Sequence, residues 1–440
     1  MTMPAPDAAA VPASTPRPGT RLGVVFLVLF LDLVGFSIVF PLFAAMLEHY
    51  EKANDPIVLA ILGVFQSLVP SADAGQRAAF FGGLLAAGYA GLQFLAAPWW
   101  GRLSDRIGRR PVILWSLLGS VLAYSLWAFT ASFAFFALSR LCAGVLSGNV
   151  SAASAAVADM TTTESRGRGM AVVGMAFGLG FILGPAIGGL TSTITVPSWA
   201  PHPFVIPALV AVILSLGNLI WAWVSFTETL APERRSTVAE DAGRTANPLR
   251  IFSSSLGSGV PAINGTVFFH TLLFAGMEST LVFLLAQCLG FKPIDCGWVF
   301  AAMGFGSALI QGGIFRRVVA TTGPRPLAVL GFLFLAPGFA VVGLVAWWPA
   351  TWILWIGVAL LAFGTGLVFP ALNTCASLSA GERNQGQILG TFRSASALGR
   401  ALGPILGAAC YFLLSPGAPY LVAAAGVIIP ILLLRRVTTR

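Results

Sequence analysis

Five ionisable side chains stand inside long apolar runs of the sequence. They are two acids and three arginines: Asp32, Arg140, Glu278, Arg393 and Arg400. A carboxylic acid in such surroundings can take up and release a proton, because its pKa responds to desolvation and to neighbouring charge. A guanidinium there can hold a carboxylate or a phosphate through paired hydrogen bonds. These residue types predict proton exchange and anion recognition.

Motifs for covalent or metal-assisted catalysis are missing from the sequence. It contains no HExxH, GxSxG or Walker A pattern, and its five cysteines have no metal-ligand spacing. We therefore expect no enzyme, no catalytic residue, no metal and no cofactor. A proton gradient would be the driving force.

The segments that carry the five charges are long enough to cross a membrane. Hydrophobic residues make up 57% of the 440 residues and charged residues only 9%, against about 25% in soluble domains. A helix needs about 20 apolar residues to cross the hydrocarbon. We predict an all-α membrane protein with twelve spans, at residues 22–47, 77–99, 111–130, 134–157, 169–192, 204–227, 260–288, 295–313, 326–346, 351–375, 386–413 and 418–434.

Two related halves divide the chain. GFILGPAIGG at 180–189 is echoed by GRALGPILGA at 399–408, and such repeats are typical of transporters with a substrate site between the halves. An amphipathic helix is expected in the outer loop around Ile57–Val69. The predicted parts are a flexible tail at 1–21, a six-helix bundle at 22–227, a linker at 228–257, a second six-helix bundle at 258–435 and a tail at 436–440.

Loop charge orients the twelve spans. With both termini in the cytoplasm, the inner segments hold 19 of the 25 basic residues and the outer segments 3, the other three lying inside spans. This asymmetry follows the positive-inside rule. The net charge of +9 comes from short clusters without the interleaved aromatics of a nucleic-acid surface, so no nucleic acid partner is expected.

Three further motifs lie within this framework. The first, GRLSDRIGRRPVIL at 101–114, joins the second and third spans with a charged, glycine-bracketed turn. A basic loop that only sets topology is one interpretation, but topology needs no acid, so Asp105 favours a functional ion network. The turn supplies the candidate gating residues Gly101, Asp105, Arg106, Gly108 and Arg109.

In the second motif, on the fifth span, glycines recur every four residues and allow close helix approach, with a proline able to kink the helix. Ordinary packing is the alternative to a functional role. The candidate packing residues are Gly174, Gly178, Gly180, Gly184, Pro185, Gly188 and Gly189. The third motif, in the first span, is LDxxGxxxxxP from Leu31 to Pro41.

These motifs resemble those of the major facilitator superfamily, from about residue 22 to 435. The 101–114 loop matches its signature G-x-L-[AS]-D-R-x-G-[RK]-[RK], and the fifth span resembles the antiporter signature of drug/proton exchangers, with Ala171 replacing its first glycine. The first span resembles that of tetracycline/proton antiporters, and the chain as a whole resembles tetracycline-transporter-like proteins most. A departure is the ninth span, which lacks the acid of the tetracycline exporters.

The resemblance implies a major facilitator fold and specific roles. Asp105 would cap a helix start in the other half, where amides and the helix dipole favour an anion. Arg109 would pair with Asp159, forming a latch that breaks when the halves rock. Arg140 resembles the fourth-helix arginine linked to proton coupling, although an arginine that snorkels to the surface is the alternative.

Substrate-binding candidates come from both halves. Arg393 and Arg400 are seven residues apart, hence on one helix face, and either bind an anion or pair structurally with Glu278 or helix carbonyls. His270 is a candidate or a packing histidine. Asn149, Gln93 and Gln287 complete the set of polar candidates, with Phe94 and Trp127 as aromatic ones.

The function these observations favour is export of an amphiphilic organic solute or drug in exchange for protons. Organic anions are among the candidate solutes, and Asp32, Glu278 and Arg140 would couple the proton. Two alternatives stay open at this point: a symporter or facilitator that imports an anionic metabolite, and a receptor or scaffold that has lost transport. The expected partners are a small-molecule substrate, protons and membrane lipid. The expected form is a multi-pass monomer in the inner (plasma) membrane with both termini cytoplasmic.

Overall fold

A computed structural model describes residues 22–68, 74–162, 165–235, 251–253, 259–291, 293–380 and 385–437. The predicted tail at 1–21 and much of the predicted linker lie outside the described residues. In the first half the helices are α1 (Leu22–Ser37), η1 (Phe40–Leu42), α2 (Phe43–Lys52), α3 (Pro56–Leu68), α4 (Ala74–Ile107), α5 (Arg109–Ala128), α6 (Phe133–Val145), α7 (Asn149–Asp159), α8 (Arg166–Thr191) and α9 (Val205–Ser225).

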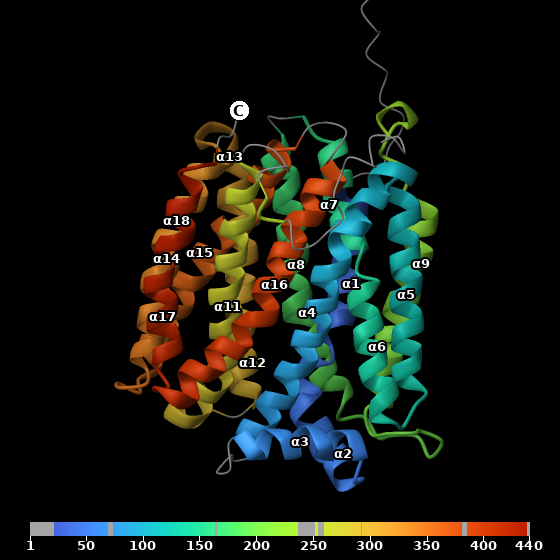
Figure 1. The fold of residues 1–440 in the computed structure, drawn as a ribbon, viewed down its shortest axis with the longest axis vertical. Coiled ribbons are helices and arrows are strands. Elements are labelled where there is room, and N and C mark those ends of the chain that lie inside the picture. The colour runs from blue at the N-terminus through green and yellow to red at the C-terminus, as the bar shows by residue number, and fades with distance from the viewer. Residues whose placement is uncertain are drawn as a thin grey trace, which may run out of the picture.

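A short turn, η2 (Pro232–Arg234), follows the first half. The helices of the second half are α11 (Val260–Leu289), α12 (Pro293–Leu309), η5 (Ile310–Phe315), α13 (Arg316–Thr322), α14 (Pro324–Leu344), α15 (Thr351–Leu378), α16 (Gln385–Leu413), α17 (Ala418–Gly426) and α18 (Ile428–Leu434). The long helices run roughly parallel, while α2 and α3 lie across the end away from the C-terminus (Figure 1).

The predicted all-α fold is confirmed for the described residues. Within the described residues, ten helices are long and apolar enough to cross a membrane. The eleventh predicted span is α16, which has 29 residues but is less apolar because it carries Arg393 and Arg400. The last is the apolar segment Ala418–Leu434. The protein is therefore a multi-pass membrane protein.

Several predicted span boundaries are wrong, at places where charged residues or a proline interrupt the apolar pattern. The first span ends at Leu42 rather than residue 47, and α2 then turns across the bundle. The second and eighth spans continue to Ile107 and Thr322, beyond the predicted 99 and 313. Their terminal arginines stay helical because long basic side chains can reach the polar interface.

Glycines pack equivalent helix pairs in the two halves. A Cβ at Gly180 would lie 2.6 Å from Leu33 Cβ on α1. Its counterpart Gly399 has the Phe268 carbonyl oxygen of α11 at 2.5 Å from the same position. The fifth span thus packs on the first, as the eleventh packs on the seventh. This matches the repeat in the sequence and makes each pair a rigid unit.

The glycines of α8 serve different neighbours. Gly180 and Gly184 face α1, and Gly188 faces Ile38 directly after it, whereas Gly174 and Gly178 face η5 and α12 of the other half. At Gly189 no described atom lies within 4 Å of the position that a Cβ would take, so none of the described helices approaches it closely, contrary to the prediction. The helix continues through Pro185.

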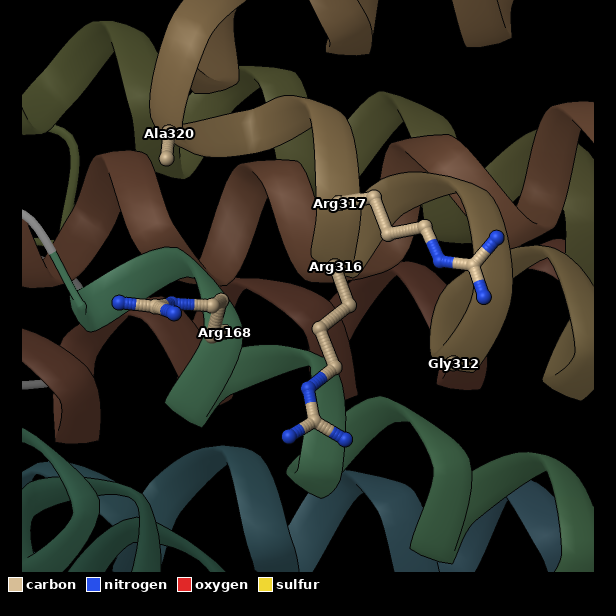
Figure 2. Close-up of a pocket in the computed structure, with 5 residues that line it drawn as sticks. All are labelled: Arg168, Gly312, Arg316, Arg317 and Ala320. Carbon is tan, nitrogen blue, oxygen red and sulfur yellow. The ribbon is translucent and has the colours of Figure 1, made fainter.

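A π-helical segment interrupts the eighth span. Residues Ile310–Phe315 form η5, between α12 and α13, and such insertions often occur at functional positions. The extra residue changes the direction in which the following side chains leave the helix. Arg316 and Arg317 follow it directly and extend in different directions (Figure 2).

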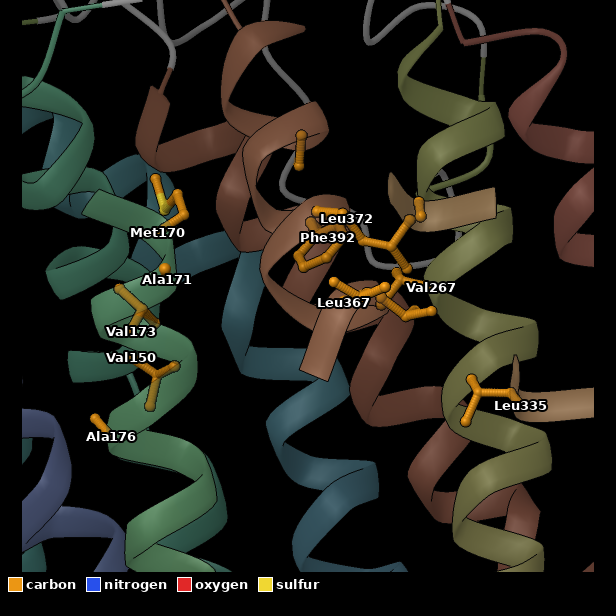
Figure 3. Packing of buried hydrophobic residues seen from close by; sticks show 14 of the residues in the cluster. Val150, Met170, Ala171, Val173, Ala176, Val267, Leu335, Leu367, Leu372 and Phe392 are labelled. Atoms are coloured by element: carbon orange, nitrogen blue, oxygen red, sulfur yellow. The ribbon is translucent and has the colours of Figure 1, made fainter. Parts of the chain in front are cut away.

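One cluster of buried apolar residues extends through both halves. It includes Val150 and Val173 from the first half and Leu367 and Phe392 from the second (Figure 3). Small residues dominate α7, where Ala152, Ala153, Ala155 and Ala156 are fully buried. Close, dry packing therefore joins the halves around the buried polar groups described below.

The neighbouring glycines at the end of α8 provide a matched test of this packing. Gly188→Ala places a methyl group 3.0 Å from the Ile38 carbonyl carbon, and overpacking of this kind costs about 1–3 kcal/mol. We expect a lower thermal unfolding midpoint for purified Gly188→Ala. Gly189→Ala should unfold at or slightly above the wild-type temperature. Equal destabilisation by both variants would contradict the assigned packing.

Candidate functional site

A buried ion network joins the two halves at one end of the bundle. Asp105, near the end of α4, accepts a hydrogen bond of 2.8 Å from the backbone N–H of Gln387 in the first turn of α16. The first N–H groups of a helix have no intrahelical partner and carry partial positive charge. The Asp105 carboxylate therefore caps a helix of the opposite half. We call the end of the bundle that contains this contact the latch end.

Arg109 holds the Asp105 carboxylate in place. Its guanidinium donates to Asp105 at 2.7 Å and, through Nε, to Asp159 at 3.0 Å. It also donates to the hydroxyl of Ser104 at 2.9 Å. The Arg109 and Asp105 side chains are 0% and 1% exposed. Buried charges of this kind are tolerated only when they are paired and hydrogen-bonded, and here two acids share one arginine.

Glu228 is a part of the site that sequence reasoning missed. Its carboxylate accepts hydrogen bonds from the backbone N–H groups of Arg109 and Arg110, at 2.8 and 3.1 Å, and so caps α5. Gly108 stands beside it with φ +107°, and a Cβ there would collide with the Glu228 carboxylate. This explains the glycine of the motif. Glu228 lay in the predicted linker, where an acid carries no local signal.

Further contacts between the halves lie at or near the latch end. Arg166 donates to the Ser377 hydroxyl at 2.9 Å. Gly390 of α16 approaches α4 so closely that a Cβ would lie 2.8 Å from the Ala97 carbonyl oxygen and 3.1 Å from Gly101 Cα. The latch end is therefore closed in this structure.

Arg106, the remaining gating candidate, is exposed. It makes no hydrogen bond or ion pair with any other described residue. The structure thus gives it no place in the latch.

Arg393 lies deeper between the halves. Its guanidinium donates to Ser154 of α7 at 3.2 Å and to Asn373 of α15 at 3.0 Å. The rings of Phe177 and Phe369 stand 4.9 and 5.6 Å from its central carbon. The side chain is buried, and Nε has no hydrogen-bond partner among the described residues. Ser154, Asn373 and the two phenylalanines are contacts that the sequence did not reveal.

The remaining charged candidates of the second half are half-buried or buried within that half. Arg400 lies close enough to exert its charge on Glu278 and His270, which sit on α11. His270 is buried and meets the Phe332 ring of α14 edge-on at 5.6 Å. That position supports the interpretation of His270 as a packing residue. It also places His270 away from the contacts that Arg393 makes with the first half.

Asp32 and Arg140 belong to one polar cluster in the first half. Asp32 accepts a hydrogen bond from Ser120 at 3.4 Å and has Asn149 beside it. Arg140 is 3% exposed and stacks over Tyr124 at 5.2 Å. Its Nε and Nη2 have no hydrogen-bond partner in the described part of the chain. The tyrosine therefore lies in the same environment as both charges.

A break in the fourth span positions Asn149 at this cluster. The helix is interrupted between Val145 and Asn149, and the indole N–H of Trp100 donates to the freed Val145 carbonyl at 2.6 Å. Gly148 provides the space, because a Cβ there would collide with the Trp100 ring. The small residues of this stretch do not predict the interruption.

The two glutamines lie apart from these clusters. Gln93 is half-buried on α4. Gln287 is exposed and accepts a hydrogen bond of 2.7 Å from the Tyr411 hydroxyl, near the far end of α11. Among the described residues, no group of three or more histidine, cysteine or acidic side chains is arranged to hold a metal.

The fold and the latch are those of a membrane transporter. The family model of the Major Facilitator Superfamily matches residues 25–404 and 267–439, and the chain belongs to this family. Its members are membrane transporters of small molecules, so the protein is a transporter and not an enzyme.

Relatives cover nearly the whole chain. The chain is 34% identical to the bovine (Bos taurus) "Major facilitator superfamily domain-containing protein 10", covering 96% of this chain and 95% of that one. It is 28% identical to the class B tetracycline resistance protein of Escherichia coli, over 88% of each chain. The crystal structure of the human organic anion transporter MFSD10 (TETRAN) is similar, with a TM-score of 0.84, 31% identity and coverage of 94% and 98%.

Neutralising Asp105 tests the latch. The Asn side chain weakens the charge-assisted bond to the start of α16, worth about 1.5–3 kcal/mol, and this bond exists only while the latch end is closed. Asp105→Asn should therefore insert and fold but transport solute at least about tenfold more slowly in vesicles. Arg106→Gln, a charge change on the same loop, should transport near the wild-type rate. Normal transport by Asp105→Asn would exclude the latch.

Proposed function

We propose that the protein is an antiporter that exports amphiphilic organic anions in exchange for protons. It would act in the plasma (inner) membrane with the latch end facing the cytoplasm, driven by the proton gradient rather than by a bound cofactor. The crowding of basic loop residues at that end supports the orientation. The structure then represents the state closed to the cytoplasm.

The observation that carries the anion preference is the environment of Arg393. Its partners Ser154 and Asn373 are neutral, and the charge acting on it in the described chain is that of Arg400, which repels it. A buried guanidinium without a counter-charge is costly. A substrate carboxylate, sulfonate or phosphate would supply that charge, and the flanking phenylalanines would contact the apolar body of an amphiphile. The similarity to an organic anion transporter supports the same substrate class.

Arg393 and Arg400 would then differ in role. Arg400 has the carboxylate of Glu278 within electrostatic reach, whereas Arg393 bridges the halves. An anion at Arg393 contacts elements of both halves, because α7 and α8 supply Ser154 and Phe177 while α15 supplies Asn373 and Phe369. Binding there would link occupancy to the rocking of the halves.

The proton would be carried by the Asp32 cluster. Asp32 has hydroxyl and amide neighbours but no salt bridge within the described residues, so it can be either protonated or charged. Arg140 and Tyr124 would adjust the balance between the two forms. Protonation from outside would accompany the return of the substrate-free carrier, which then releases the proton to the cytoplasm.

Proton coupling is tested by Asp32→Asn in proteoliposomes. The variant should lose uphill transport driven by a pH gradient, because it cannot release a proton. Exchange of labelled for unlabelled solute should persist in part, which also shows that the variant is folded. Glu278→Gln is the matched change in the other half. Uphill, pH-driven transport by Asp32→Asn would remove Asp32 from the coupling mechanism.

Substrate charge is tested by replacing arginine with lysine. Arg393→Lys keeps the charge but loses the paired, planar donors, so we expect about tenfold weaker binding of an anionic amphiphile. A neutral analogue of the same size should bind as before. Arg400→Lys is the control and should affect anion binding less. Preference of the wild type for cations, or normal anion binding by both lysine variants, would contradict the proposed substrate class.

A further inference from the structure

Three arginines line a cavity between the halves, apart from the latch and from Arg393. The cavity has a volume of about 370 Å³ and is lined by Arg168, Gly312, Arg316, Arg317 and Ala320. Arg168 lies in the first turn of α8, in the first half. Arg316 and Arg317 begin α13, in the second half, directly after the π-helical segment (Figure 2).

The arginines have no counter-charge in the described chain. All three side chains are exposed, and none has an ion pair or hydrogen bond to another described residue. At the latch, by contrast, Arg109 is shared by two acids. Like charges that line one cavity repel one another. An anion in the cavity would remove this repulsion and accept hydrogen bonds from both halves.

The position of the cavity selects a lipid as the source of the anion. Arg316 lies six residues before the end of α13 at Thr322, or about 9 Å along the helix, which corresponds to the headgroup region. On α12, Phe305 and Leu309 lie one turn apart and are 55% and 57% exposed. Gly312 follows a turn later at the cavity. An apolar track thus leads away from the basic cavity, as two-part recognition of a phospholipid requires.

We propose that this cavity binds the phosphate of an anionic phospholipid from the leaflet at the latch end, with its acyl chains along the exposed face of α12. The bound headgroup bridges α8 and α13 and stabilises the closed latch end. The assignment of this leaflet as cytoplasmic rests on the proposed function, but binding itself does not. Anionic lipids of that leaflet attract basic groups near the membrane surface.

The test measures binding to the purified full-length protein in a neutral detergent. The probes are short-chain phosphatidylglycerol, phosphatidylcholine of the same chain length, and inorganic phosphate, each titrated while thermal unfolding is followed. Phosphatidylglycerol should raise the unfolding midpoint, and the other two should do so far less. Arg168→Gln and Arg316→Gln should each raise the phosphatidylglycerol concentration that gives half of the stabilisation about tenfold. Arg436→Gln, which removes an exposed arginine elsewhere at the same end, should not.

Each other outcome overturns the proposal. Equal responses of the wild type and both cavity variants would show that the lipid binds elsewhere. An equal response to phosphatidylcholine would show that charge is not recognised, and an equal response to inorganic phosphate would identify a site for a soluble anion. Arg316→Lys checks folding, because it keeps the charge and should retain part of the response. Transport is not measured, so failure here leaves the proposed antiport intact.

Discussion

The contact between the Asp105 carboxylate and the start of α16 decides whether the two halves can meet. It is buried, and on the side of the first half Arg109 pairs with both Asp105 and Asp159. The hydrogen bond from Gln387 crosses to the second half. The network thus keeps its internal ion pairs when the halves separate and loses a charge-assisted bond, worth about 1.5–3 kcal/mol. Such a latch is strong enough to bias the closed state and weak enough to open.

Each half is built to move as a unit around this contact. Glycines hold α8 against α1 and α16 against α11 at backbone distance, whereas the contacts between the halves at Arg393, Arg166 and Gly390 involve polar or small groups. Sites with paired charge and sites with unpaired positive charge both face this interface. At the latch both acids already have Arg109 as a partner, while Arg393 and the cavity of Arg168 and Arg316 hold positive charge that a ligand must complement. Closure is therefore sensitive to the anions present.

Sequence patterns predicted the helices because hydropathy and loop charge act locally. They also predicted Asp105 and Arg109, since an acid in a basic turn has no topological purpose. Residues whose role depends on a partner distant in sequence were missed: Glu228 is an ordinary linker acid until α5 lies beside it, and Asn373 is an ordinary polar residue until it meets Arg393. Several helix ends were predicted wrongly for a related reason, because charged residues such as Arg106 continue a helix into the polar interface of the membrane. The open space around Gly189 could not be predicted either, since the sequence does not show which glycines another helix approaches.

Closure of the latch end depends most on the hydrogen bond from the Gln387 N–H, and Gln387→Pro removes that donor. Proline lacks the N–H and is tolerated in the first turn of a helix. Gln387→Ala keeps the N–H and serves as the control. Spin labels at Thr162→Cys and Thr322→Cys, both exposed at the latch end of opposite halves, report the separation in proteoliposomes by electron–electron double resonance. We predict a shift to longer distances in Gln387→Pro and an unchanged distribution in Gln387→Ala. Identical, short distances in both variants would contradict the role of this hydrogen bond.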